Sequence, residues 1–122
     1  MLPRNFLRPC LLLLLREQPA HGYELLERLQ AFGFDRSDPG GLYRTLRTLE
    51  DVDLVTSAWE SSTSGPDRRI YSITRAGMQE LHTNAKALAE SSRMLDSFLS
   101  RYQEFVTLRE RRESGVPGST SR

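Results

Sequence analysis

The feature that most constrains the fold is a short amphipathic segment that begins near Pro39. Leucines recur at positions i, i+4 and i+7 between Leu42 and Leu49, so they share one face of a helix. Ser37 or Asp38 can serve as the N-cap, and proline is well tolerated at the first helical position. The segment therefore predicts a helix with a buried leucine face and an opposite face that carries arginines.

Two β-prone runs follow this helix, at residues 54–60 and 69–73. They are joined by residues 61–67, a stretch of serine, threonine, glycine, proline and aspartate that favours a turn. Arg68 and Arg69 place two permanently charged guanidinium groups beside this turn. A helix followed by a hairpin with a basic tip predicts a winged helix-turn-helix, a fold that binds double-stranded DNA.

Two further helices are expected earlier in the chain. The apolar run at residues 10–15 favours a helix that is buried on all sides, and Pro19 ends it. Residues 22–32 carry apolar side chains on one side and predict the supporting helix of the motif. The expected fold class is mainly α with a small β-hairpin.

The candidate DNA contacts are the residues that face away from the leucines, together with the basic hairpin. Arg44 and Arg47 project from the outer face of the helix, where either can pair with guanine in the major groove. Glycine is disfavoured in a helix, so Gly40 at the helix start favours either a close approach to a phosphate or a loosely wound first turn. The full set comprises Tyr43, Arg44, Arg47, Thr48, Gly40, Arg68, Arg69, His21 and Tyr23.

These residues also have plainer interpretations. An arginine pair on a helix face is commonly a solvated surface. Charge on an edge strand prevents aggregation even where it binds nothing. His21 and Tyr23 stand at a helix start, where they can meet a phosphate or serve only as cap and packing residues.

The order and spacing of several short motifs resemble the PadR family of bacterial transcriptional regulators. The motifs are His-Gly-Tyr at residues 21–23, Gly-Leu-Tyr-x-x-Leu-x-x-Leu-Glu at 41–50 and Gly-Pro-x-Arg-Arg-x-Tyr-x-Ile-Thr-x-x-Gly at 65–77. The resemblance covers roughly residues 4–108, and residues 4–10 are most similar to a group described as polyhydroxybutyrate-responsive repressors. It implies a winged-helix regulator of transcription, most often a repressor of its own or a neighbouring operon.

The sequence departs from the family pattern at two positions. Arg44 stands where many members carry proline, which is expected to alter base preference. Asp53 stands where a helix-ending glycine is usual, and glycine normally supplies the left-handed cap there. The second departure predicts a less regular end to the recognition helix.

A heptad pattern after Thr74, a plausible N-cap, predicts a long C-terminal helix. From residue 75 to about residue 109 this helix would extend roughly 50 Å, too long to be stable without a partner for its apolar seam. A homodimer is therefore expected, on an inverted-repeat target with half-sites about one DNA turn apart. The seam residues are Leu81, Ala85, Leu88, Leu95, Leu99 and Tyr102.

The expected organisation has three parts. Residues 1–74 form the winged helix-turn-helix domain, and residues 75–112 form the dimerisation helix. Residues 113–122 are rich in serine and glycine and are expected to be disordered.

Many members of the PadR family respond to a small molecule that binds between the long helices and the first helix. The residues that would line such a space are Phe6, Cys10, Leu14, Leu88, Met94, Leu95 and Phe98. The alternative is that this stripe is plain core, which is the commoner meaning of apolar residues at helical spacing. The resemblance names no effector.

Composition sets limits on the partners of the chain. The formal net charge is only +1, so DNA contacts must come from local patches. The apolar run at residues 10–15 is far shorter than the roughly 18 residues that a membrane-spanning helix needs. The lone Cys10 cannot form an internal disulfide, and a cytoplasmic protein is expected.

An enzyme is not expected. The sequence has no nucleophile elbow, phosphate-binding loop or cluster of carboxylates. His21, His82 and Cys10 are too dispersed to form a metal site, and no cofactor is expected.

The rival interpretation is a winged-helix dimer that acts as a protein-interaction module without specific DNA binding. Glu50, Asp51 and Asp53 favour it, because they place negative charge at the end of the recognition helix, where they would repel phosphate. If only the first half of the helix enters the groove, Arg47 can pair with Asp51 and the repulsion is tolerable.

Overall fold

The computed structural model of the protein describes residues 3–113. They fall into two units, one that ends at Ala85 and one that begins at Lys86. The division lies inside the last helix of the chain. The tail predicted at residues 113–122 lies outside the described residues except for Glu113, which is helical.

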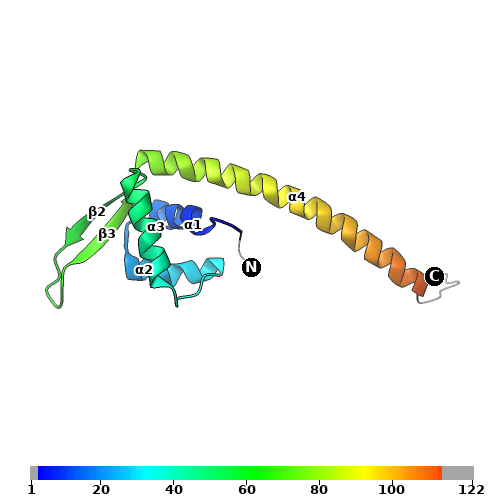
Figure 1. Ribbon diagram of the computed structural model, residues 1–122, viewed down its shortest axis with the longest axis horizontal. Helices are drawn as coiled ribbons and strands as arrows, with labels where there is room; N and C mark the ends of the chain where they lie inside the picture. The colour runs from blue at the N-terminus through cyan, green and yellow to red at the C-terminus, as the bar shows by residue number, and fades with distance from the viewer. Residues whose placement is uncertain (1–2, 114–122) are drawn as a thin grey trace. The chain divides into compact units, whose positions relative to one another are not determined.

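The first unit is a helical domain with one small sheet (Figure 1). Its elements are α1 (Leu7–Glu17), β1 (Ala20–His21), α2 (Gly22–Arg28), a 3-10 helix (Leu29–Phe32), α3 (Pro39–Asp51), β2 (Val55–Glu60), β3 (Arg68–Ile73) and the first turns of α4 (Arg75–Glu113). The expected fold class is confirmed, with a winged helix-turn-helix built from α2, α3 and the hairpin of β2 and β3. This hairpin is the wing.

Two details of this architecture differ from the sequence prediction. The sheet has three antiparallel strands in the order β1-β3-β2, because Ala20 pairs with Tyr71 and His21 with Ile70. A strand of two residues is too short to show the alternation that predicts strands. The helix expected at residues 22–32 is α2 followed by a 3-10 turn, and Gly33 ends that turn with a φ of 94°.

Helix α1 supplies much of the hydrophobic core, as its apolar run predicts. It packs against α2, α3 and β3. Leu13 is the exception to burial on all sides, since it is 37% exposed. Each fully buried leucine contributes about 1.5–3 kcal/mol to folding. The buried residues of α1 are Cys10, Leu11, Leu12, Leu14 and Leu15.

The start of α3 is capped by Asp38, one of the two candidates from the sequence. Its Oδ1 accepts a hydrogen bond from the Gly41 N–H at 3.0 Å, and Pro39 occupies the first turn. The predicted leucine face is confirmed, because Leu42 and Leu46 are both buried. The opposite face of α3 is thereby turned to solvent.

The end of α3 is more regular than the sequence predicts, so that prediction was wrong. Asp53 itself adopts the left-handed conformation, with a φ of 60°. The Leu54 N–H donates to the Leu49 carbonyl at 2.9 Å and the Asp53 N–H to the Glu50 carbonyl at 3.0 Å. These two bonds form a complete Schellman cap. Aspartate tolerates the left-handed region better than most residues, which is why the cap forms without glycine.

The turn after α3 also holds the start of α4. The Thr74 hydroxyl lies 2.8 Å from the Asp53 carbonyl oxygen and 3.0 Å from that of Leu54, and it accepts from the Gly77 N–H at 3.0 Å. Thr74 is therefore the N-cap of α4, as predicted. A Cβ at Gly77 would collide with the Leu54 carbonyl, so this close approach requires glycine. The contact joins the beginning of β2 to the beginning of α4.

The second unit consists of the rest of α4, which continues to Glu113. Of the predicted seam residues, Leu81 packs against the core of the first unit, while Ala85 is exposed. Leu95, Leu99 and Tyr102 are each more than half exposed. The helix also exposes Met94, Phe98, Phe105 and Leu108. So much exposed apolar surface is unusual for a stable helix in water.

We expect Asp53→Gly to stabilise the protein by about 0.5–1 kcal/mol, because glycine adopts the left-handed cap without a steric penalty. Thermal and urea unfolding monitored by circular dichroism measure the change. Asp51→Gly is the matched control, since it makes the same substitution at the last residue of α3, outside the left-handed cap, where no stabilisation is expected. If both substitutions destabilise, the strain assigned to Asp53 is wrong.

Candidate nucleic-acid interface

The outer face of α3 presents Arg44 and Arg47, both exposed, directly opposite the buried leucines. A Cβ at Gly40 would lie 3.1 Å from Nη1 of Arg44, so the guanidinium group folds back over the first turn of the helix. Gly40 thus makes room for the Arg44 side chain. Thr48 is exposed on one flank, with its hydroxyl donating to the Arg44 carbonyl at 3.1 Å.

Tyr43 lies on the other flank of α3, next to the start of α2. A Cβ at Gly22 would run into the Tyr43 ring, so the two helices approach closely at this glycine. The ring is still 44% exposed. Tyr43 therefore packs the helix-turn-helix together and keeps part of its surface open on the same side as the arginines.

His21 is held by two carboxylates. Its Nδ1 lies 2.9 Å from Oε1 of Glu24, and its Nε2 lies 2.8 Å from Oε1 of Glu60. Its backbone N–H also donates to Glu24 at 2.8 Å, which completes a capping box at the start of α2. The side chain is only 12% exposed. This geometry is that of a cap residue, the plainer interpretation that the sequence left open for His21.

The backbone hydrogen bond from His21 lowers the pKa of the Glu24 carboxyl from its ordinary value of 4.5, and the side-chain bond from His21 adds to this. Tyr23 stacks on the His21 ring at a centroid distance of 5.6 Å. Tyr23 is itself exposed and lies at the edge of the wing. The start of α2 is thus tied to the outer strand of the wing through Glu60.

Arg68 and Arg69 are adjacent on β3 and therefore point to opposite faces of the sheet. Arg68 lies on the outer face, where its Nη1 donates to the Tyr23 hydroxyl at 2.9 Å. Its Cζ also lies 5.8 Å from the centroid of the Tyr23 ring. Both of these contacts are with a neutral partner, and Arg68 is exposed.

Arg69 lies on the inner face, toward α3. Its Nε donates to the Ser57 hydroxyl at 2.7 Å, and its Nη2 lies 3.7 Å from Oε2 of Glu50. Its Cζ lies 5.1 Å from the centroid of the Trp59 ring. The sequence missed Glu50 and Ser57 as partners, although the strand register that sets Trp59 opposite Arg69 follows from the length of the hairpin.

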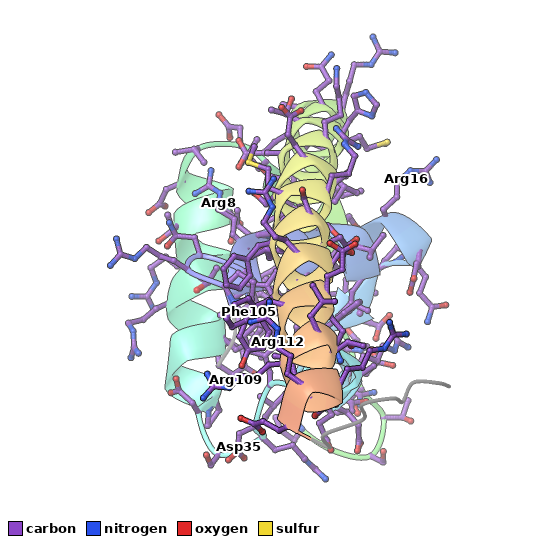
Figure 2. The ribbon with its side chains drawn as sticks, turned by 90° about the vertical axis from the view of Figure 1, so that its right-hand side faces the viewer. Arg8, Arg16, Asp35, Phe105, Arg109 and Arg112 are labelled. Atoms are coloured by element: carbon purple, nitrogen blue, oxygen red, sulfur yellow. The ribbon has the colours of Figure 1, made fainter. Side chains whose placement is uncertain are left out.

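The flank of α3 that carries Thr48 borders a cavity of about 540 Å³ within the first unit. Arg8 and Glu80 form an ion pair of 2.7 Å in its wall. Figure 2 shows Arg8 toward α3 and Arg16 near the other end of α1. The remaining lining residues are Asn5, Leu7, Thr45, Thr48 and Asn84.

The predicted effector residues are divided between the two units. Cys10 and Leu14 are buried in the core of the first unit, and Phe6 stacks on Phe34 at a centroid distance of 6.0 Å. Burial raises the pKa of the Cys10 thiol to about 11, so the thiol stays protonated. The second unit contributes Leu88, half-buried, and Met94, Leu95 and Phe98, all exposed.

Within residues 3–113 no cluster of histidine, cysteine, aspartate or glutamate is suited to hold a metal ion. No helix in this described part of the chain is long and apolar enough to cross a membrane.

Residues 11–83 match the model of the transcriptional regulator PadR-like family. The chain belongs to this family. None of the proteins with curated descriptions matches it. As a family member it is a transcriptional regulator and not an enzyme, which agrees with the sequence prediction.

Solved structures of similar regulators share the fold. A conserved protein of unknown function, described as a potential transcriptional factor, is 32% identical with a TM-score of 0.72, over 88% of this chain and 99% of that one. A PadR family regulator from Eggerthella lenta is 29% identical with a TM-score of 0.69, over 79% and 83%. A PadR-like regulator from Bacillus cereus is 27% identical with a TM-score of 0.68, over 76% and 90%.

We expect Glu24→Gln to lower thermal stability at neutral pH and to have a shrinking effect in acid. Because the pKa of Glu24 is lower in the folded protein than in the unfolded chain, its contribution is fully present above the unfolded pKa. That contribution is lost as the pH falls through the folded pKa. Melting temperatures from pH 7 to pH 3 measure the effect. Glu27→Gln, one residue from the same helix, should leave a small and nearly constant difference.

Proposed function

We propose that this PadR-family regulator binds an inverted-repeat operator as a homodimer and represses transcription. The observation that carries the proposal is the arginine face of α3, which is exposed while the opposite leucine face is buried in the core. A recognition helix needs this arrangement, because its outer side chains must reach base edges while the core holds its angle.

Arg44 and Arg47 are the proposed base-reading residues. Each guanidinium group can donate two parallel hydrogen bonds to O6 and N7 of guanine in the major groove. Tyr43 and Thr48 flank them on the two sides of the helix and can contact the DNA backbone or the thymine methyl group. Gly40 contributes the room that the Arg44 side chain occupies.

Arg68 is the proposed backbone contact of the wing. Its hydrogen-bond and ring partner is the neutral Tyr23, so its positive charge is available to a phosphate. Tyr23 orients the guanidinium group without neutralising it. A pre-oriented arginine loses less conformational entropy when it binds a phosphate.

The exposed apolar stripe of the second unit supports homodimerisation. Leu95 and Leu99 are 61% and 56% exposed, one turn apart on α4. Burying such a stripe against a second copy is strongly favourable, and a two-fold axis would then present two α3 helices to the two half-sites. Release by a small-molecule effector remains an inference from the family alone.

Substitution of either recognition arginine tests the base contacts. We expect Arg44→Ala or Arg47→Ala to weaken binding to the operator by about 1–3 kcal/mol and to relax specificity at one base pair. The measurement is fluorescence anisotropy with a labelled fragment of the upstream region of the gene, beside a scrambled fragment. Arg16→Ala removes the same charge from the end of α1 that lies away from Arg8 in Figure 2, and should bind normally.

If wild type shows no saturable binding even at low salt, to that fragment or to genomic DNA, the protein-interaction module becomes the better interpretation. If both arginine variants bind like wild type, the groove assignment is wrong.

Charged substitutions in the apolar stripe test the dimer. We expect the double variant Leu95→Lys, Leu99→Lys to dissociate to monomers, because two buried lysines cannot be accommodated in a seam. Size-exclusion chromatography with light scattering measures the mass. Ser100→Lys adds a charge to the same helix and is the control that should remain dimeric. An unchanged mass for the double variant would contradict the proposed seam.

A further inference from the structure

The two arginines of the wing have different electrostatic surroundings. Arg68 donates to a neutral phenol and has Glu60 opposite it in the strand register, while Arg69 lies 3.7 Å from the carboxylate of Glu50. The positive charge of Arg69 is therefore partly offset within the protein. A guanidinium group that already has protein partners gains less from a phosphate, since the exchange gives up the bond to Ser57 and the pairing with Glu50.

Ser57 lies at the centre of this contact. Its hydroxyl donates to Oε2 of Glu50 at 2.7 Å and accepts from Nε of Arg69 at 2.7 Å. The donor and acceptor roles of the hydroxyl are both used, so the order from Arg69 through Ser57 to Glu50 is fixed. These three residues come from β3, β2 and α3, so one small network joins both strands of the wing to the recognition helix.

Trp59 covers the remaining face of the guanidinium group. Trp59 and Arg69 are direct partners in the strand register, and Cζ of Arg69 lies 5.1 Å from the centroid of the indole ring. The indole is itself 66% exposed. A hydroxyl, a carboxylate and a ring thus contact the Arg69 head group, and the side chain is 39% exposed.

We infer that Arg69 is a positioning residue: with Glu50 and Ser57 it fixes the inner face of the wing to the C-terminal end of α3. It makes no phosphate contact of its own. The effect of this anchoring on operator binding rests on the proposed function. The angle between the wing and the recognition helix would then determine whether both elements contact the same DNA duplex. The anchoring itself is a property of the free protein.

The alternative is that the ion pair with Glu50 prevents Arg69 from contacting a phosphate. The two ideas predict opposite signs. If Glu50 positions the wing, removing its charge weakens DNA binding. If Glu50 restrains Arg69 or repels phosphate, removing its charge tightens binding and steepens the salt dependence.

The anchoring is measured without DNA, because Trp59 is the only tryptophan of the chain and reports on the wing directly. We expect Ser57→Ala and Glu50→Gln to lower the fluorescence anisotropy of Trp59 and to increase its quenching by acrylamide. Thr56→Ala removes a hydroxyl from the opposite face of the same strand and should leave both signals unchanged. Far-UV circular dichroism verifies that each variant is folded.

The role in binding is measured as the salt dependence of operator affinity. We expect Ser57→Ala to weaken binding about 2- to 10-fold with an unchanged slope of log K against log salt. Arg69→Ala should behave in the same way, whereas Arg68→Ala should reduce the slope by about one. Arg69→Lys keeps the charge but lacks the Nε donor and the planar face, so it should not restore wild-type affinity.

Three results would overturn the inference. One is a Trp59 signal that is the same in wild type, Ser57→Ala and Glu50→Gln. Another is tighter binding by Glu50→Gln with a steeper slope. The third is a slope reduced by about one in Arg69→Ala. If wild type binds no DNA, the proposed function fails, and the Trp59 measurement still decides whether the network anchors the wing.

Discussion

The turn between α3 and β2 is the constraint on which the rest of the first unit depends. Asp53 reverses the chain in a left-handed conformation, and the Leu54 carbonyl oxygen then accepts from the Thr74 backbone N–H at 3.1 Å. The N–H of Leu54 thus ends the recognition helix by bonding to Leu49, and the carbonyl of the same residue docks the start of α4, just before the first strand of the wing begins. The close approach at Gly77 follows from the same contact. A shift of this turn would move α3, the wing and α4 together.

Beyond this turn, the strand register determines on which face of the sheet each side chain of the wing lies. Side chains alternate across a sheet, so the adjacent Arg68 and Arg69 lie on opposite faces. Arg68 meets the start of α2 through Tyr23, and Arg69 meets the end of α3 through Ser57 and Glu50. The wing is therefore held on both faces by elements of the helix-turn-helix. Arg68 and Arg69 are identical and adjacent in the sequence, but their structural environments differ.

The parts of the fold that were predictable are those with a local repeating pattern. The leucines of α3 and the turn-forming residues between β2 and β3 determine their elements within a few positions of sequence. The two-residue β1, the left-handed Asp53 and the contact from Arg69 to Glu50 were not predictable in this way. Each depends on where distant segments meet, and Arg69 reaches Glu50 only because the turn at Asp53 lays the hairpin beside α3.

The acidic end of α3 is the strongest sequence argument against DNA binding, and the structure weakens it. Of its carboxylates, Glu50 faces the wing and is paired with Arg69 and Ser57, so it is partly neutralised and turned away from the outer face. Asp53 belongs to the turn, beyond the last turn of the helix. Asp51 alone remains on the outer face, one turn after Arg47. A duplex that meets the first half of α3 would therefore encounter Arg44 and Arg47 before Asp51, which is the geometry a recognition helix requires.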